Sequence, residues 1–344
     1  MAGCAGSGDC SSPYASSPQF KGCLFANPPN PLTPPSASTW SNWTRFLTQG
    51  KHDTVPVDPL PTRALTAARL DALDTRANHL VRFGHSALLL ELQGKFWLID
   101  PMLGERASPV GFAGPKRFAP PPMAREQLPP IEGLILSHDH YDHLDAPTIG
   151  YLALRVQRFF VPLGLKARLV GMGVSAGRVQ ELDWWQSAVQ GGVTLTAAPA
   201  QHFSGRTLWD RNRTLWASWV IESGGQRLYY SGDSGYSGHF KAIAERFGGF
   251  DVALIENGEY DAGWPGVHMT PEESVRAFED LNAKVLFPVH NIGFDLAFHT
   301  WREPLDRIAA LAAAKNIELA TPEIGEVMTV GRPRENARWW AGLK

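Results

Sequence analysis

SHDHYDHLD, at residues 137–145, directly follows the apolar run at 133–136. The pattern HxHxDH inside it is formed by His138, His140, Asp142 and His143. Neutral imidazole nitrogens and carboxylate oxygens are ligands that zinc accepts, and a loop after a strand can turn several of them toward one point. In a purely solvated loop, so dense a cluster would be an accident of composition. The stretch therefore predicts a metal site at the end of a buried strand.

The composition bounds the class of protein. A chain of 344 residues forms one large domain or two smaller ones, and 44% hydrophobic with 19% charged residues is ordinary for a globular protein. The net charge of -2 argues against nucleic-acid binding, because such proteins normally carry a basic excess. No apolar run reaches the ~18 residues that a membrane-spanning helix needs. We expect a globular protein with no nucleic-acid partner.

Residues 1–75 are predicted to be a leader. Its first 60 residues are rich in Ser, Pro, Asn and Gly and lack a sustained apolar period. Aromatic stretches at 20–25 and 40–46 indicate that the leader packs along the body, because exposed aromatics on a free tail would be unfavourable. A catalytic domain is expected at 76–330 and a C-terminal tail at 331–344.

All three cysteines lie in this leader, at Cys4, Cys10 and Cys23, so the rest of the chain offers neither disulfides nor thiolate ligands. The tripeptide Ala-Gly-Cys at 2–4 is similar to the end of a bacterial lipoprotein processing site. With lipid on Cys4, the other two cysteines could form a disulfide in an oxidising compartment. The alternative is an unstructured cytosolic leader with free thiols. The first interpretation favours the bacterial cell envelope, as a periplasmic or lipoprotein-like protein, over the cytoplasm.

Short β-rich segments alternate with helical ones along the rest of the chain. Strands are predicted at 79–83, 87–92, 95–99, 133–137, 158–161, 193–198, 217–222, 226–231, 252–255 and 284–289. Helices are predicted at 146–156, 164–172, 239–247, 271–281 and 301–314. The fourth helix has the clearest start, because Thr270 as N-cap and Glu273 form a capping box around Pro271. Two β-rich halves with helices predict an α/β (αββα) sandwich, in which two mixed β-sheets pack face to face with helices on both outer sides.

Separate segments carry a family resemblance that spans residues 19–328. They are IDP at 99–101, ERASP at 105–109, AGPKR at 113–117, HxHxDH, GDSGY at 232–236, HMTPEE at 268–273 and FPVH at 287–290. On these segments the chain resembles the metallo-β-lactamase-fold hydrolases. Within them it is most similar to the bacterial relatives of N-acyl-phosphatidylethanolamine-hydrolysing phospholipase D. The resemblance implies the metallo-β-lactamase fold and a metal-dependent hydrolase.

Three further polar residues follow predicted strands: His202, Asp233 and His290. A glycine before Asp233 lets the backbone turn sharply. The resemblance assigns one zinc ion to His138, His140 and His202, and a second to Asp142, His143 and His290, with Asp233 bridging. It implies two Zn2+ per chain. Asp100 would stand behind a ligating histidine and accept its free ring N–H.

Two zinc ions a few ångströms apart would hold a bridging water as hydroxide at neutral pH and polarise the substrate oxygen. In a phosphodiester, the hydroxide would attack phosphorus in line. The predicted catalytic residues are Asp142, Asp233 and His268. His268 is interpreted as a partner of the phosphate or leaving group, or as a plain helix-entry histidine. His140 separates the chain from the flavodiiron branch of the superfamily, which carries Glu at that position.

Four residues are predicted to contact substrate: Lys116, Arg117, Trp185 and Tyr260. The basic pair could meet a phosphate or form an ordinary solvated loop. The aromatic residues could line an apolar wall for acyl chains or serve packing alone. The segments ENGEY at 256–260 and HNIGF at 290–294 depart from the characterised relatives on the substrate side. These departures argue against N-acyl-phosphatidylethanolamine itself as the substrate, even if the chemistry is that of a phosphodiesterase.

The leading hypothesis is a binuclear zinc phosphodiesterase of phospholipase D type that acts on a phospholipid or other amphiphilic phosphodiester. The alternative enzyme is a zinc-dependent lactonase or other carbonyl-ester hydrolase, because the same hydroxide also attacks carbon. The alternative outside catalysis is a cell-envelope binding protein that retains the fold. The expected partners are a lipid-like or small-molecule ester and a membrane, through peripheral or lipid-anchored association. The oligomeric state is not predicted.

Overall fold

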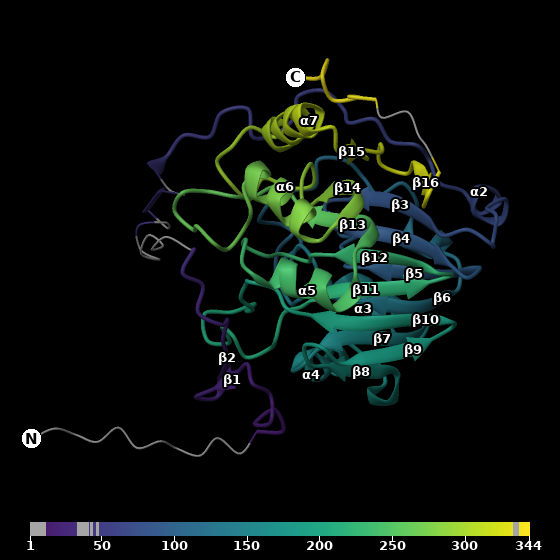
Figure 1. Cartoon of the computed structure of the whole chain (residues 1–344), viewed down its shortest axis with the longest axis vertical. Coiled ribbons are helices and arrows are strands. Elements are labelled where there is room, and N and C mark those ends of the chain that lie inside the picture. The colour runs from purple at the N-terminus through teal and green to yellow at the C-terminus, as the bar shows by residue number, and fades with distance from the viewer. Residues whose placement is uncertain (1–11, 33–40, 42–43, 46–47, 333–336) are drawn as a thin grey trace, which may run out of the picture.

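The computed structural model describes residues 12–32, 41, 44–45, 48–332 and 337–344, and two seven-stranded sheets form its body (Figure 1). The first sheet has the order β16 (Val327–Thr329), β3 (His79–Gly84), β4 (Ala87–Leu92), β5 (Lys95–Ile99), β6 (Ile131–Ile135), β7 (Val156–Pro162) and β8 (Val179–Leu182). The second has the order β15 (Glu318–Leu319), β14 (Ala283–Val289), β13 (Phe250–Glu256), β12 (Gln226–Tyr230), β11 (Ser218–Ser223), β10 (Val193–Ala198) and β9 (Ser187–Gln190). Both sheets are mixed, because β5 to β8 and β12 to β15 pair in parallel while the remaining neighbours are antiparallel.

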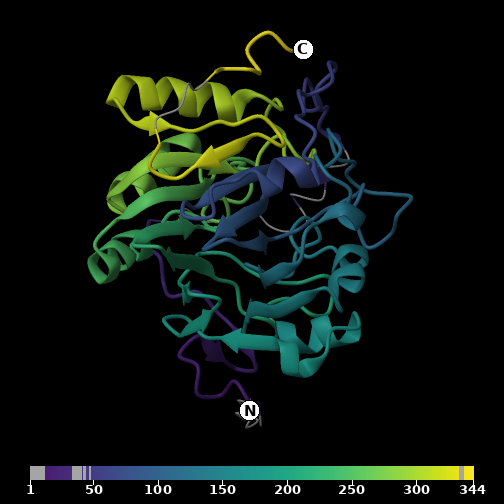
Figure 2. The ribbon, with the colours of Figure 1, turned by 90° about the vertical axis from the view of Figure 1, so that its right-hand side faces the viewer.

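Helices cover the outer face of each sheet. The second sheet carries α5 (His239–Phe247), α6 (Pro271–Asp280) and α7 (Glu303–Lys315), and the first carries α3 (Ala146–Leu152) and α4 (Leu165–Gly171). Figure 2 shows the green and yellow helices on one side of the strands and the teal helices on the other. Shorter elements are β1 (Phe20–Lys21), β2 (Leu24–Phe25), α2 (Ala67–Asp71) and 3-10 turns at Arg125–Gln127 and Ala176–Arg178. The helices in the described part of the chain lack the length and hydropathy to span a bilayer.

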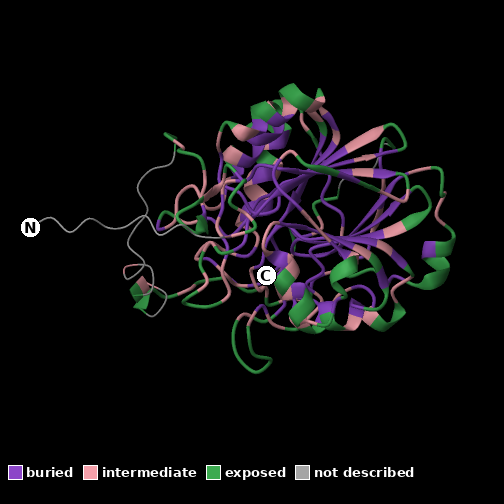
Figure 3. Cartoon of the chain, turned by 90° about the horizontal axis from the view of Figure 1, so that it is seen from below, coloured by how far each residue is buried: buried purple, intermediate pink, exposed green. Residues whose placement is uncertain are grey.

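The apolar core has three layers that follow from the alternation of side chains along the strands. On β4, Leu88 and Leu90 point between the two sheets, whereas Leu89 points into the layer beneath α3 and α4. Both faces of β4 are therefore buried, which explains its unbroken apolar sequence. A third layer packs the second sheet against α5 to α7 around Phe240 and Ile308. Figure 3 shows the buried strands in purple between helices whose outer faces are exposed.

Each predicted strand and helix has a counterpart, and the predicted αββα sandwich is confirmed. The capping box is also present, since the hydroxyl of Thr270 accepts from the N–H of Glu273 and the Glu273 side chain accepts from the N–H of Thr270. The predicted helix at 146–156 is wrong at its end. Helix α3 stops at Leu152, and Val156 begins β7, where it is completely buried and pairs with Ile131.

Besides the two-residue strands β1 and β2, four strands of the two large sheets have no counterpart in the prediction: β8, β9, β15 and β16. They are the four edge strands of the two sheets, and they contain only two to four residues each. A strand this short shows too few alternations for a period of two to be recognised. Its pairing is decided by the neighbouring strand rather than by its own sequence.

The leader and the C-terminal residues both contact the body. Phe25 is completely buried in the layer between the sheets, with the ring of Phe20 at 5.0 Å. The amide Nδ2 of Asn27 donates to the backbone carbonyl of His202 at 2.7 Å. At the other end, Trp340 is completely buried and its indole N–H donates to Asp306. Strands β1 and β2 of the leader are purple at the lower left of Figure 1, and α2 lies on the opposite side of the body.

Part of the leader lies outside the described residues. This applies to the predicted aromatic contacts of Trp40, Trp43 and Phe46, and to Cys4 and Cys10. Cys23 takes part in a disulfide bond.

Candidate metal centre

The residues predicted as metal ligands lie on loops that follow strands of both sheets. Residues 138–143 follow β6, His202 follows β10, Asp233 follows β12 and His290 follows β14. Strands β12 and β14 both run parallel to β13, so their carboxyl ends reach the same edge of the second sheet. Face-to-face packing of the sheets then sets these loops opposite the loop after β6. The structure thus brings together side chains that are up to 152 positions apart, from His138 to His290.

One group consists of His138, His140, His202 and Asp233, whose potential ligand atoms all lie within 4.8 Å of one another. Nε2 of His138 is 2.8 Å from Nδ1 of His140 and 3.5 Å from Oδ2 of Asp233. Burial lowers the pKa of His138 and of His202 well below the ordinary value. Both rings are therefore neutral and present a lone pair, which is the state that binds a metal ion.

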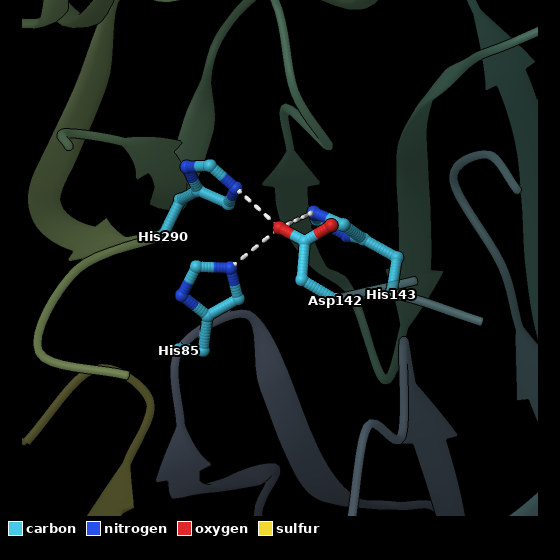
Figure 4. A group of neighbouring side chains, drawn as sticks. All are labelled: His85, Asp142, His143 and His290. Carbon is cyan, nitrogen blue, oxygen red and sulfur yellow. Dashed lines mark hydrogen bonds and ion pairs between the residues drawn. The ribbon is translucent and has the colours of Figure 1, made fainter. Parts of the chain in front are cut away.

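A second group consists of His85, Asp142, His143 and His290 (Figure 4). Oδ2 of Asp142 lies 2.9 Å from Nε2 of His85, 3.1 Å from Nε2 of His290 and 3.4 Å from Nε2 of His143. Figure 4 shows the three rings converging on this oxygen. The arrangement offers up to three nitrogens and one carboxylate to a single ion.

Asp233 lies between the two groups. Its Oδ1 is 3.1 Å from Nε2 of His143, and its Oδ2 is 3.1 Å from Nε2 of His290 and 3.7 Å from Nε2 of His202. One carboxylate therefore reaches histidines of both groups. This is the placement that a ligand shared by two ions requires.

The chemistry of these side chains fits bound metal. His143 Nε2 and Asp233 Oδ1 are buried and lie 3.1 Å apart, yet neither makes a hydrogen bond of good geometry among the described residues; a metal ion would satisfy both. Burial lowers the pKa of His143, but the carboxylates of Asp233, Asp142 and Asp100 outweigh burial and hold this pKa well above its ordinary value. Without metal, a proton on the His143 ring thus supplies the positive charge that a bound metal ion would otherwise supply to these carboxylates. Metal binding should therefore release protons and weaken at acidic pH.

Asp100 supports the second group from behind. It is completely buried, and its Oδ2 accepts a hydrogen bond from Nδ1 of His143 at 2.7 Å and another from the hydroxyl of Tyr230 at 2.6 Å. Its Oδ1 accepts from the backbone N–H of Ser137 at 2.8 Å. The bond to Nδ1 selects the tautomer of His143 whose Nε2 lone pair faces the site.

Several site residues adopt left-handed backbone conformations. The φ angles are 52° at His85, 39° at Asp100 and 59° at His290. Such conformations cost of order 1–3 kcal/mol each in a residue with a Cβ and persist only where the surroundings enforce them. Gly232 has φ 55°, and a Cβ there would lie 2.7 Å from Cβ of Ser137. The predicted need for glycine before Asp233 is therefore confirmed.

The loop that carries HxHxDH is clamped by the segment after His202. The guanidinium of Arg206 donates to the carbonyls of Asp139 and Leu144, each at 2.7 Å, and lies 3.9 Å from the ring centroid of Tyr141. The carboxylate of Asp139 points away from the site and pairs with Arg168 at 2.9 Å. These contacts hold both ends of the loop, which keeps its ligands in position.

His268 and Glu256 form a pair at the edge of the centre. Nδ1 of His268 lies 2.8 Å from Oε2 of Glu256, and the backbone N–H of Met269 donates to Oε1 at 2.6 Å. Glu256 is completely buried at the end of β13, and the ring of His268 stacks on that of His290 with centroids 5.0 Å apart. With Nδ1 engaged, Nε2 of His268 is the nitrogen left to meet a substrate.

The four predicted substrate residues differ in burial and in the partners that they contact. Arg117 is only 9% exposed and donates to the carbonyls of Met102 and Gly104, so it stabilises its own loop and its placement argues against contact with a phosphate. Lys116 is exposed and pairs with Glu105 at 2.9 Å. The hydroxyl of Tyr260 donates to Glu303 and its ring stacks on His299, which is a packing role. Trp185 lines a groove beside the site.

Two site residues were missed from the sequence. His85 lies in the turn between β3 and β4, outside the strands predicted at 79–83 and 87–92. Glu256 is the last residue of β13. The rule that selected His202 and His290, a polar residue at the end of an apolar strand, would have selected both.

Comparisons with known proteins agree with this geometry. The family described as the β-lactamase superfamily domain matches residues 97–291. An uncharacterized protein of Mycobacterium tuberculosis is 40% identical over 289 residues, which cover 83% of this chain and 77% of that protein. N-acyl-phosphatidylethanolamine-hydrolyzing phospholipase D 1 of Caenorhabditis elegans is 34% identical over 305 residues, which cover 82% of this chain and 85% of that protein. The solved structure of Igni18, a metallo hydrolase from Ignicoccus hospitalis, matches with a TM-score of 0.55 and 21% identity, over 75% of this chain and 100% of that one.

Proposed function

The chain belongs to the β-lactamase superfamily as a metal-dependent hydrolase of metallo-β-lactamase fold, and from this premise we propose that it is a binuclear zinc phosphodiesterase of phospholipase D type. The observation that carries the proposal is the pair of ligand groups that meet at Asp233. A single carboxylate in reach of histidines from both groups suits two ions better than one.

The first ion would be held by His138, His140 and His202, the second by Asp142, His143 and His290, and both by Asp233. His85 is close enough to Asp142 to join or orient the second group. Bound zinc would supply an activated water at neutral pH and polarise a phosphoryl oxygen. Zinc fits the imidazole and carboxylate donors and the absence of thiolates among them.

The protein residues position the reaction. Asp100 orients His143, and Glu256 orients His268 through Nδ1. His268 Nε2 would hold a proton beside the leaving alkoxide, which needs one when the phosphorus–oxygen bond breaks. The segment after His202 and the loop after β6 brace each other through Arg206, so the ligands need little rearrangement when substrate binds.

A phospholipid or other amphiphilic diester is the proposed substrate. The relative from Caenorhabditis elegans carries the name of a phospholipase and supports this choice. We further propose association with a membrane surface and location in the cell envelope, since the disulfide of Cys23 suits an oxidising compartment.

The test uses the full chain purified without chelator. Elemental analysis should find about two zinc ions per chain, and the protein should hydrolyse bis-p-nitrophenyl phosphate and short-chain phospholipids. Asp233→Asn should lose at least about 100-fold in kcat/KM, because removal of a group that holds the catalytic apparatus costs this much or more. Asp251→Asn, a carboxylate paired with Lys284 at the far end of β13, is the matched control. Activity confined to acyl-homoserine or sugar lactones would refute the phosphodiesterase, and negligible metal would refute the binuclear centre.

A further inference from the structure

An apolar groove of about 600 Å³ runs between the leader and the start of α5. Its walls include Pro28, Pro31, Trp184, Trp185, Pro199 and Ala242. The volume lies within the ~300–1,000 Å³ range of pockets that hold small molecules. No residue of this groove belongs to either ligand group.

The groove adjoins the metal centre through two chain segments. Gln201 lines the groove and directly precedes His202. Its backbone N–H donates to Oγ of Ser234 at 2.9 Å, and Ser234 directly follows Asp233. The leader closes the other side, where Asn27 bonds to the carbonyl of His202. The segment at 199–202 and the segment at 233–239 therefore each carry both a metal ligand and residues that line the groove.

Several polar groups beside the groove are engaged within the protein. Oγ of Ser237 lies 2.5 Å from Nδ1 of His239, and the indole N–H of Trp184 donates to the carbonyl of Trp216 at 2.7 Å. Asn30 donates to the carbonyl of Tyr236 at 2.8 Å. Burial lowers the pKa of His239 to about 3, so its ring is neutral. The groove thus presents mainly proline, tryptophan and alanine surface, and the residues that line it carry no charge; Gln19 and Gln201 also line it.

We propose that this groove binds an acyl chain of the substrate while the phosphodiester lies at the metal centre. The inference rests on the proposed function for the position of the head group and deepens it by naming the site of the chain. A peptide is a poorer occupant, because its backbone N–H and C=O groups would need hydrogen-bond partners in an apolar groove. A methylene chain needs none.

Direct binding tests the groove without catalysis. The probe is 9,10-dibromostearate, whose bromines quench tryptophan fluorescence on contact, at concentrations below micelle formation. The wild-type holoenzyme should show saturable quenching, and Trp185→Phe should reduce its amplitude. Ala242→Phe should lower the affinity roughly 15-fold if the ring excludes two methylenes, since each buried methylene contributes about fourfold. Ala313→Phe, on an exposed residue of α7, is the matched control and should bind as wild type.

A second variant guards against misfolding. Leu32 is 55% exposed and lines the groove, so Leu32→Glu adds a charge there without disturbing the core and should also weaken binding. Wild-type affinity in both Ala242→Phe and Leu32→Glu would overturn the inference, as would absence of quenching in the wild type. The proposed function fails separately: if dibromostearate binds in the groove but no phosphodiester is hydrolysed, the acyl site stands and the phosphodiesterase does not.

Discussion

Asp100→Asn should weaken one of the two metal sites and spare the other. The carboxylate of Asp100 is completely buried and accepts from Nδ1 of His143 at 2.7 Å, from Ser137 and from Tyr230. Asparagine has the same shape, but its Nδ2 donates and can no longer accept. Loss of such a partner behind a ligating histidine typically costs 10–100-fold in metal affinity, or about 1.4–2.7 kcal/mol.

The assay is a competition titration of metal-free protein with zinc against a chromophoric chelator. The wild type should show two sites, and Asp100→Asn should weaken the site that contains His143 by roughly 10–100-fold. The site formed by His138, His140 and His202 should change by less than about threefold. Among the described residues, Asp100 has no hydrogen bond to His140 or His202, and it reaches His138 only through the hydroxyl of Ser137. Asp251→Asn again serves as the control. Equal wild-type affinity at both sites of Asp100→Asn would refute the reasoning.

Three further outcomes are expected. Gly133→Ala should lower the free energy of unfolding in urea by about 1–3 kcal/mol, because its Cβ would lie 2.2 Å from the buried ring of Trp97. The control is Gly171→Ala, whose Cβ meets nothing within 4 Å among the described residues and should leave stability unchanged. Equal effects of the two substitutions would contradict this prediction. Burial raises the pKa of Glu259 to about 8, against ~4.3 in the unfolded chain. Between pH ~4.3 and about 8 the folded protein therefore keeps a proton on Glu259 that the unfolded chain has lost, and the free energy of unfolding falls as pH rises through this range. Glu259→Gln should therefore gain thermal stability relative to wild type from pH 5 to pH 8, and a constant difference over that range would count against the buried acid. Chelation should lower the unfolding temperature, and zinc at 100 times its Kd should restore about 2.7 kcal/mol; an unchanged temperature would argue against a bound ion.

Local sequence patterns were sufficient for the central elements and insufficient for the edges. Strand β4 is buried on both faces and reads as an unbroken apolar run, so it was predictable. The edge strand β15 has two residues, and it exists because β14 offers it free backbone groups. Val156 was assigned to the wrong element because an apolar residue fits either period, and its pairing with Ile131 decides between them.

The same division holds within the site. Strand-end position and side-chain type identify His202, Asp233 and His290. His85 and Glu256 also follow or end strands, but only the fold shows that they lie close to the other residues. Arg117 shows why type and position alone are insufficient: a basic residue in a loop suggests a phosphate contact, whereas in the fold its guanidinium donates to the carbonyls of Met102 and Gly104.

By itself, the sequence determined which donor atoms this protein has and at which strand ends they occur, because side-chain chemistry and apolar periodicity are properties of short segments. Tertiary structure alone decided which of these atoms lie within reach of one ion, that Asp233 stands between two groups, and that an apolar groove adjoins them. These features depend on the order of strands in two sheets and on how the sheets face each other. Contacts between residues of different strands determine both, from Phe96 with Ile131 to Val81 with Val327, and no local pattern records them.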